Sequence, residues 1–301
     1  MSAPLLRYTG PLAGLPPAER ARLLERTGTG DAQVAARAAA IIARVRQGGD
    51  RALLELAEEL DRVRLPSLEV PREACARALE ARAPELRTAL ERAARNIARA
   101  HAAQRPAPVE VETEEGVLLG RRPDPLGRVG VYAPGGRAVY PSSVLMGVVP
   151  AKVAGVGEVV VCSPPGPNGL PAAGVLAAAA LAGADRVFAL GGAGAIAALA
   201  YGTQSVPRVD RIVGPGNAYV AAAKLQVVGA VAIDAPAGPS EILVVADAGV
   251  DPEAVAREML AQAEHDPDAC CVTLALGADA AGRIAAALQR QAAGAQRREI
   301  V

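Results

Sequence analysis

The sequence is poor in aromatic and histidine residues. Among 301 residues there is no tryptophan, one phenylalanine, five tyrosines and two histidines. The core must therefore be filled by aliphatic side chains, and a hydrophobic content of 51% is enough for a sizeable one. The shortage of aromatic rings removes the stacking platforms on which single-stranded nucleic acids bind. With only His101 and His265, one chain cannot build a zinc site from histidines alone.

The sequence also lacks an excess of charge, because 32 basic side chains balance 32 acidic ones. This balance argues against nucleic acid or a membrane surface as a partner. Gly, Pro or charged residues interrupt the apolar stretches before about 18 residues, so no transmembrane helix is expected. The N-terminus has no secretory signal pattern, and the four cysteines form no CxxC pair. Together these features predict a cytoplasmic protein in a reducing compartment.

The pattern of hydrophobic residues predicts an α/β protein. The first hundred residues indicate helices, including one over 31–47 that Gly48 and Gly49 end and another that begins at Asp50, followed by a hairpin over 109–119. From residue 128, short apolar runs alternate with Ala-rich helices, which is typical of a mostly parallel sheet covered on both faces. A second, smaller set follows from residue 242. The strands expected in the first set are Val129–Tyr132, Val159–Cys162, Val187–Leu190, Arg211–Val213 and Ala230–Ile233.

Three glycine-rich turns are expected at the carboxyl ends of these strands, at 133–136, 191–194 and 214–217. Glycine there lets backbone N–H groups approach an anionic ligand closely, although each turn alone is also consistent with a simple tight turn. Gly192, Gly194 and Ala197 have the spacing of the dinucleotide-binding fingerprint. The fingerprint is weak, because the acidic residue that should follow it, Asp210, precedes a strand instead of ending one.

A helix predicted over 251–265 carries a second candidate site. Asp251 is suited to cap it, and Val255 and Met259 mark its buried side. Gln262 continues that stripe and His265 lies one turn further on. One interpretation is a buried Gln bonded to backbone with His265 as a cation at the helix end. The other is that both side chains bind a ligand, and spacing alone does not decide between them.

Seven segments, in order along the chain, resemble one family, the histidinol dehydrogenases. The GPGN, AGPSE and QAEH blocks in this order are highly specific, and with the helical N-terminus the resemblance covers nearly the whole chain. The segments are Val131–Gly136, Tyr140–Met146, Pro150–Val156, Ala195–Thr203, Gly214–Asn217, Ala237–Glu241 (with Ile233 and Asp234 before it) and Gln262–His265.

The resemblance implies a zinc- and NAD-dependent enzyme of histidine biosynthesis that oxidises L-histidinol to L-histidine in two hydride transfers. It implies a homodimer and two incomplete Rossmann-like parallel-sheet domains with a helical N-terminal region. Residues 1–127 and 236–301 are expected to form the N-terminal helices and the first α/β domain, with the metal and substrate residues. Residues 128–235 are expected to form the second α/β domain, on the NAD side.

Individual roles follow from the same resemblance. Carried over by position, Tyr132 and Asn217 contact NAD, and Ser240 contacts the substrate. Gln262 and His265 bind zinc and line the substrate pocket. Zinc in such a site holds the imidazole and amine of the substrate and so orients its alcohol carbon towards the nicotinamide.

The chain departs from the family pattern in two ways. Gly194 stands where the family has a Gln that contacts NAD, which weakens one contact and creates the apparent fingerprint. The family's Glu-His pair for proton transfer, and an Asp and a His that complete its zinc shell, correspond to positions beyond Val301. No catalytic residue is therefore assigned within the 301 residues.

Three interpretations remain open at this point. The chain is part of a histidinol dehydrogenase, a short form that binds NAD or another ligand without turnover, or a related zinc- and NAD-dependent alcohol dehydrogenase with another substrate. The DNA that follows the codon for Val301 distinguishes the first two, since a continuation encoding a Glu-His pair favours the first.

We predict that the purified 301-residue chain alone oxidises L-histidinol at a negligible rate. Positioned acid–base groups contribute about 10²–10⁴-fold to such reactions, and the assigned pair is not among these residues. Formation of NADH, followed by its absorbance, measures the rate. Robust NAD-dependent turnover by the chain with no other protein present would contradict the prediction.

Overall fold

The structure is a computed structural model that describes residues 5–24, 32–135, 139–235, 240–264 and 269–295. The chain forms two compact units, one of residues 1–29 and 238–301 and the other of residues 30–237. Within the described ranges, no helix is both long and apolar enough to cross a membrane.

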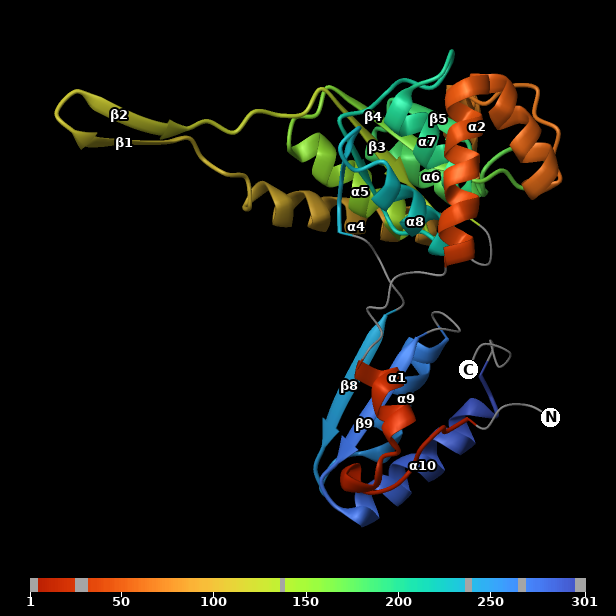
Figure 1. The fold of residues 1–301 in the computed structure, drawn as a ribbon, viewed down its shortest axis with the longest axis vertical. Coiled ribbons are helices and arrows are strands. Elements are labelled where there is room, and N and C mark those ends of the chain that lie inside the picture. The colour runs from red at the N-terminus through yellow and green to blue at the C-terminus, as the bar shows by residue number, and fades with distance from the viewer. Residues whose placement is uncertain (1–4, 25–31, 136–138, 236–239, 265–268, 296–301) are drawn as a thin grey trace. The chain divides into compact units, whose positions relative to one another are not determined.

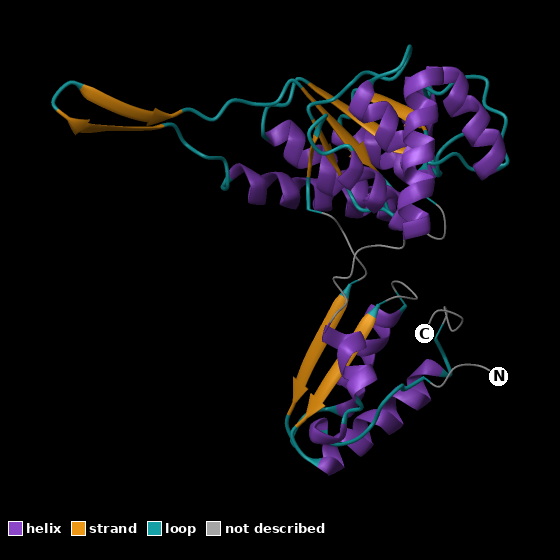
Figure 2. Ribbon diagram, in the orientation of Figure 1, coloured by secondary structure: helices purple, strands orange, loops and turns teal. Residues whose placement is uncertain are grey.

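The larger unit is built on a five-stranded sheet with helices on both sides (Figures 1 and 2). This confirms the predicted α/β class with N-terminal helices. The elements in chain order are α2 (Ala32–Leu56), the π-helical turn η2 (Ala57–Asp61), α3 (Arg72–Glu80), α4 (Pro84–Ala102), β1 (Val109–Glu114), β2 (Val117–Arg121), β3 (Arg128–Tyr132), α5 (Pro141–Val153), β4 (Glu158–Ser163), α6 (Ala173–Ala182), β5 (Arg186–Ala189), α7 (Gly192–Tyr201), β6 (Arg211–Val213), α8 (Ala218–Gln226) and β7 (Ala232–Ile233).

The strands of this sheet are all parallel, in the order β5-β4-β3-β6-β7. The chain moves outwards from β3 through β4 to β5 and then returns to place β6 on the other side of β3. Val131 of β3 is thus paired with Val161 of β4 and with Val213 of β6. The order therefore reverses between β3 and β6, and ligands bind open α/β sheets outside the carboxyl ends of the strands at such a switch point.

Each face of the sheet is covered by two layers of helices. Right-handed crossovers place α5 and α6 on one face and α7 and α8 on the other. Helices α3 and α4 pack over α6 and α5, and α2 packs over α7 and α8. Strands β3 and β4 are almost completely buried, which explains their continuous runs of apolar residues.

Helix α2 is two helices joined at Gly49, whose φ of 56° is left-handed, as the Gly48-Gly49 pair predicts. The next residue, Asp50, is tied to the segment after α7. Its carboxylate accepts hydrogen bonds from the hydroxyls of Thr203, at 2.5 Å, and Ser205. Its backbone N–H donates to the side chain of Gln204 at 2.9 Å. These contacts hold the start of the second half of α2 against the segment that follows α7.

The smaller unit is a strand–helix–strand motif followed by a helix. Strands β8 and β9 are parallel, and α9 and α10 pack together against one face of the pair. On the other face, Leu243 and Val245 are 60% and 62% exposed. The elements are η1 (Leu12–Gly14), α1 (Pro17–Leu24), β8 (Glu241–Ala246), α9 (Pro252–Ala263), β9 (Cys270–Ala275) and α10 (Ala278–Ala292).

The observed units differ from the expected domains in one respect. The boundary expected between 235 and 236 lies close to the observed one between 237 and 238. Residues 30–127, however, belong to the unit of the five-stranded sheet and not to that of residues 238–301. The physical reason is that α2, α3 and α4 bury their apolar sides on the helices that cover this sheet.

We expect Asp50→Asn to destabilise the larger unit in a pH-dependent way. Burial acts to raise the pKa of Asp50, but hydrogen bonds from Ser205 and Thr203 outweigh it and lower the pKa. A lowered pKa stabilises the fold above the unfolded value of about 3.9, and this contribution is lost as the pH falls through the folded value. The substitution should therefore cost about 1 kcal/mol near neutral pH and progressively less in acid.

Urea unfolding followed by circular dichroism at several pH values measures this difference. Asp124→Asn is the control, because Asp124 is 66% exposed and pairs only with the exposed Arg122 among the interactions seen. A cost at Asp50 that stays constant down to acidic pH would contradict the assignment.

Candidate functional site

A pocket of about 300 Å³ lies at the switch point of the five-stranded sheet. The first turn of α5 forms one wall and the end of β6, with the residue after β7, forms the other. Serine hydroxyls and one carboxylate give it polar groups among apolar walls. The lining residues include Ser142, Ser143, Val213, Gly214, Pro215 and Asp234.

The backbone of Gly214 is fixed from both sides where it enters this pocket. Its N–H donates to Asp234 Oδ2 at 2.8 Å, and its carbonyl accepts from Lys224 Nζ at 3.0 Å. Lys224 and Asp234 also form an ion pair with each other. The φ of Gly214 is 115°, and a Cβ atom there would lie 2.1 Å from the carbonyl oxygen of Tyr132. Only glycine therefore fits at this position.

Lys224 is the most deeply buried charged side chain among the described residues, with 2% exposure, whereas the Asp234 side chain is 34% exposed. A buried ammonium must be paired and hydrogen-bonded, and the carboxylate and the Gly214 carbonyl meet this need. Neither residue is predicted from the sequence to have a role. The available signal was a single Lys on the otherwise uncharged helix that follows the GPGN block.

Asn217 ends the GPGN turn and caps α8. Its Oδ1 accepts a hydrogen bond from Val220 N–H at 3.1 Å, so the amide orientation is set by the helix. The side chain is exposed, and its NH₂ group remains able to donate to a ligand. The geometry is thus compatible with the contact to NAD that the resemblance assigns.

Tyr132 is buried and holds the start of α7 in place through its hydroxyl group. It is 3% exposed, and its hydroxyl accepts from Gly192 N–H at 3.1 Å. Burial raises the pKa of Tyr132 to about 12, although the hydrogen bond from Gly192 opposes this. The neutral phenol holds the first residue of α7 beside β3, and a contact to NAD stays a prediction.

Gly194 lies in the first turn of α7, away from the switch point, because β5 is an edge strand. A Cβ atom there would lie 3.5 Å from Leu53 Cδ2 on α2, at ordinary contact distance. Residues 192–197, which have the fingerprint spacing, follow the edge strand β5. In dinucleotide-binding folds the fingerprint instead follows a central strand, next to the switch point. This placement supports discounting the fingerprint.

The predicted helix with Gln262 is α9. The Asp251 carboxylate caps it by accepting from Glu253 N–H at 3.0 Å, and Val255 and Met259 are buried, as predicted. The Nε2 atom of Gln262 is buried and has no hydrogen-bond partner among the described residues. An unpaired buried amide costs free energy, so this side chain fits a site where another group completes its interactions.

The remaining predicted site residues are Ser240 and His265. Ser240 is half-buried just before β8, and its carbonyl accepts from Cys270 N–H at 3.1 Å. His265 lies outside the described residues. Among the residues that are described, no three His, Cys, Asp or Glu side chains form a group suited to a metal. Zinc binding therefore stays a prediction that rests on Gln262 and His265.

We expect Lys224→Met to lower the free energy of unfolding of the larger unit by about 2 kcal/mol, because it removes the buried ammonium that binds both the Asp234 carboxylate and the Gly214 carbonyl. Lys152→Met is the matched control. Lys152 pairs with Asp185 at 2.5 Å, but both side chains are 31% exposed, so the expected loss is below about 1 kcal/mol. Urea unfolding of both variants tests this, and equal losses would contradict it.

Comparison with known proteins identifies the family. A family model described as histidinol dehydrogenase matches residues 24–301. Histidinol dehydrogenases of Methanosarcina mazei and Natronomonas pharaonis are 47% and 52% identical over 96% of this chain, which spans 67% and 68% of their lengths.

A solved structure shows the same likeness. The crystal structure of histidinol dehydrogenase from Elizabethkingia anophelis matches 95% of this chain with a TM-score of 0.87 and 34% identity, and the match covers 66% of that chain. The chain thus spans about two thirds of the length of these relatives. Sequence and fold agree over almost all of its residues, and the chain belongs to the histidinol dehydrogenase family.

Proposed function

We propose that this protein is an NAD- and zinc-dependent dehydrogenase that oxidises L-histidinol to L-histidine in histidine biosynthesis. The overall reaction passes two hydrides to two NAD molecules and adds one water to the intermediate aldehyde. Family membership supports this activity. The observation that carries the metal and substrate part is the buried amide of Gln262, which lacks a partner among the described residues.

Gln262 and His265 are the residues proposed to hold zinc in this chain. Gln262 lies in the last turn of α9, and His265 follows it three residues later in the sequence, a spacing at which two helical side chains share one face. When bound, zinc supplies a Lewis-acidic centre that holds the imidazole and amine of histidinol. The Ser240 hydroxyl, at the start of β8, is proposed to bind the same substrate.

The pocket at the switch point is proposed to receive part of NAD, which accepts the hydride when bound. The Asn217 NH₂ group is exposed and able to donate to the cofactor, and the Lys224–Asp234 pair fixes the turn that carries Asn217. Tyr132 contributes by holding Gly192 and the start of α7. No side chain among the 301 residues is proposed to transfer the protons.

The protein is further proposed to form a homodimer and to act in the cytoplasm. The resemblance supports a homodimer. The cysteines Cys75, Cys162, Cys270 and Cys271 are all unpaired, which is typical of a reducing compartment such as the cytoplasm.

We expect zinc and L-histidinol to bind the chain with positive coupling. Competition against a colorimetric chelator measures the zinc dissociation constant with and without histidinol. If zinc holds the substrate, histidinol should strengthen zinc binding, because the coupling between two bound ligands is reciprocal. L-Leucinol, an amino alcohol without an imidazole, should give a smaller effect. Equal effects of the two alcohols would overturn histidinol as the substrate and favour another alcohol.

The role of Gln262 is tested with Gln262→Met, which keeps the shape and removes the amide. Zinc affinity should fall at least about tenfold. The metal-free protein should become more stable, by about 1 kcal/mol, because a buried unpaired amide is lost. Gln289→Met is the control on the exposed side of α10 and should change neither quantity. A loss of stability in metal-free Gln262→Met would show that Gln262 has a structural partner and would contradict the assignment.

A further inference from the structure

The hairpin of β1 and β2 projects from the rest of the larger unit, beyond the end of α4 (Figure 1). Every residue of both strands is exposed. A two-stranded hairpin on its own is at best marginally stable in water and needs further strands or a packing surface. We therefore expect another molecule to supply the strands or the packing surface that this hairpin lacks.

One face of the hairpin is mainly apolar, with Arg121 at its end opposite Val109. The cross-strand pair Val111 and Leu119 lies on it, together with Val109 and Val117. These side chains are 49–67% exposed. Glu110 lies on the opposite face. Exposed valine and leucine side chains gathered on one face of two strands mark an interaction surface.

The two edges of the hairpin differ in charge. The edge strand β1 carries three glutamates, Glu110, Glu112 and Glu114, so two copies of this edge would repel each other. Strand β2 has no acidic residue and ends in Arg121. Its outer edge presents unpaired backbone N–H and C=O groups, which are a template for another strand.

We propose that β2 pairs in antiparallel fashion with β2 of a second copy of this chain, with Leu119 opposite Leu119 on the two-fold axis. This inference rests on the homodimer proposed above and assigns it a surface. The two hairpins then form one four-stranded sheet, and the apolar residues of both copies share one face. Such symmetric, self-complementary contacts are typical of two-fold dimers.

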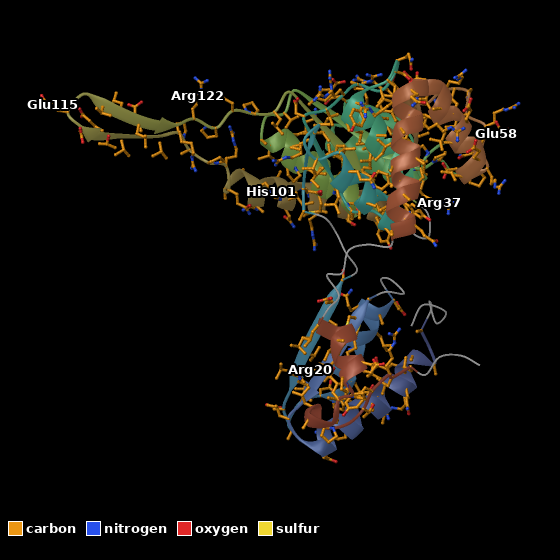
Figure 3. The ribbon with its side chains drawn as sticks, viewed as in Figure 1. Arg20, Arg37, Glu58, His101, Glu115 and Arg122 are labelled. Atoms are coloured by element: carbon orange, nitrogen blue, oxygen red, sulfur yellow. The ribbon has the colours of Figure 1, made fainter. Side chains whose placement is uncertain are left out.

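Charge complementarity supports this register. With Leu119 on the axis, Arg121 lies opposite Val117 of the second copy, and Arg122 lies opposite Gly116, next to Glu115 of that copy. Figure 3 shows Glu115 at the tip of the hairpin and Arg122 near its base, so the antiparallel pairing brings opposite charges together at both ends. Strands of this length bury less area than a typical stable interface of about 1,200–2,000 Å², so they form one part of the dimer contact.

The first test is the mass of the protein in solution, measured by sedimentation over a wide range of concentrations. We expect a dimer whose dissociation constant rises at least tenfold in Leu119→Lys, because two ammonium groups then lie directly opposite each other on the axis. Leu60→Lys is the control, since Leu60 is 58% exposed on a distant part of the same unit. A dimer that Leu119→Lys leaves unchanged overturns the pairing but not the homodimer, and a monomer at every concentration overturns both.

The second test fixes the register by disulfide cross-linking. Opposed residues in antiparallel strands have Cα atoms about 4.5–5.5 Å apart, within the reach of a disulfide. Under mild oxidation Leu119→Cys should form a covalent dimer, while Glu110→Cys and the unmodified chain should not. Cross-linking through Glu110→Cys, or none through Leu119→Cys, overturns the proposed pairing.

Discussion

The buried ammonium group of Lys224 holds the backbone at the centre of the candidate site. It joins the carbonyl of Gly214 to the carboxylate of Asp234, whose other oxygen binds the N–H of Gly214. The end of β6, the residue after β7 and helix α8 are thereby locked into one arrangement. Because Asn217 follows on the same turn and caps α8, its position depends on this ion pair. The site is thus positioned by an ammonium group that is almost completely buried.

Much of the fold could be predicted because its signals are local. The apolar runs of β3 to β7, the glycine pair that ends the first half of α2 and the capping Asp251 each depend on a few neighbouring residues. The five predicted strands and the buried side of α9 are confirmed. The grouping of α2, α3 and α4 with the sheet depends on long-range packing, which no local pattern encodes. Leu60 continues the apolar spacing of the helix that begins at Asp50, but it is 58% exposed because the helix becomes a π-helical turn at Ala57.

The site was predicted less completely than the fold. Asn217 and Gln262 were found through motifs, and the structure adds the physical context of each. Asn217 caps α8 through its amide oxygen, and the buried amide nitrogen of Gln262 has no partner among the residues that the structure describes. The serines of α5 and Asp234 lie in segments that match the family, but their spacing does not predict that they line one pocket, because they come together only when α5, β6 and β7 pack. The ion pair of Lys224 with Asp234 depends on the same long-range packing. The order of the strands also decides which glycine turn lies at the ligand-binding switch point. Gly214 lies at the switch point and Gly192 at the edge, which the turn sequences alone could not distinguish.

The contacts of Asp50 have a consequence for how the protein is made. The partner of its backbone N–H, Gln204, lies 154 residues further along the chain. At a synthesis rate of about 5–20 residues per second, the ribosome needs roughly ten to thirty seconds to produce that partner after α2 has emerged. During this interval the apolar side of α2 has neither α7 nor α8 to pack against. The apolar side of α2 is therefore left without its native packing on the nascent chain until the second half of the sheet is translated.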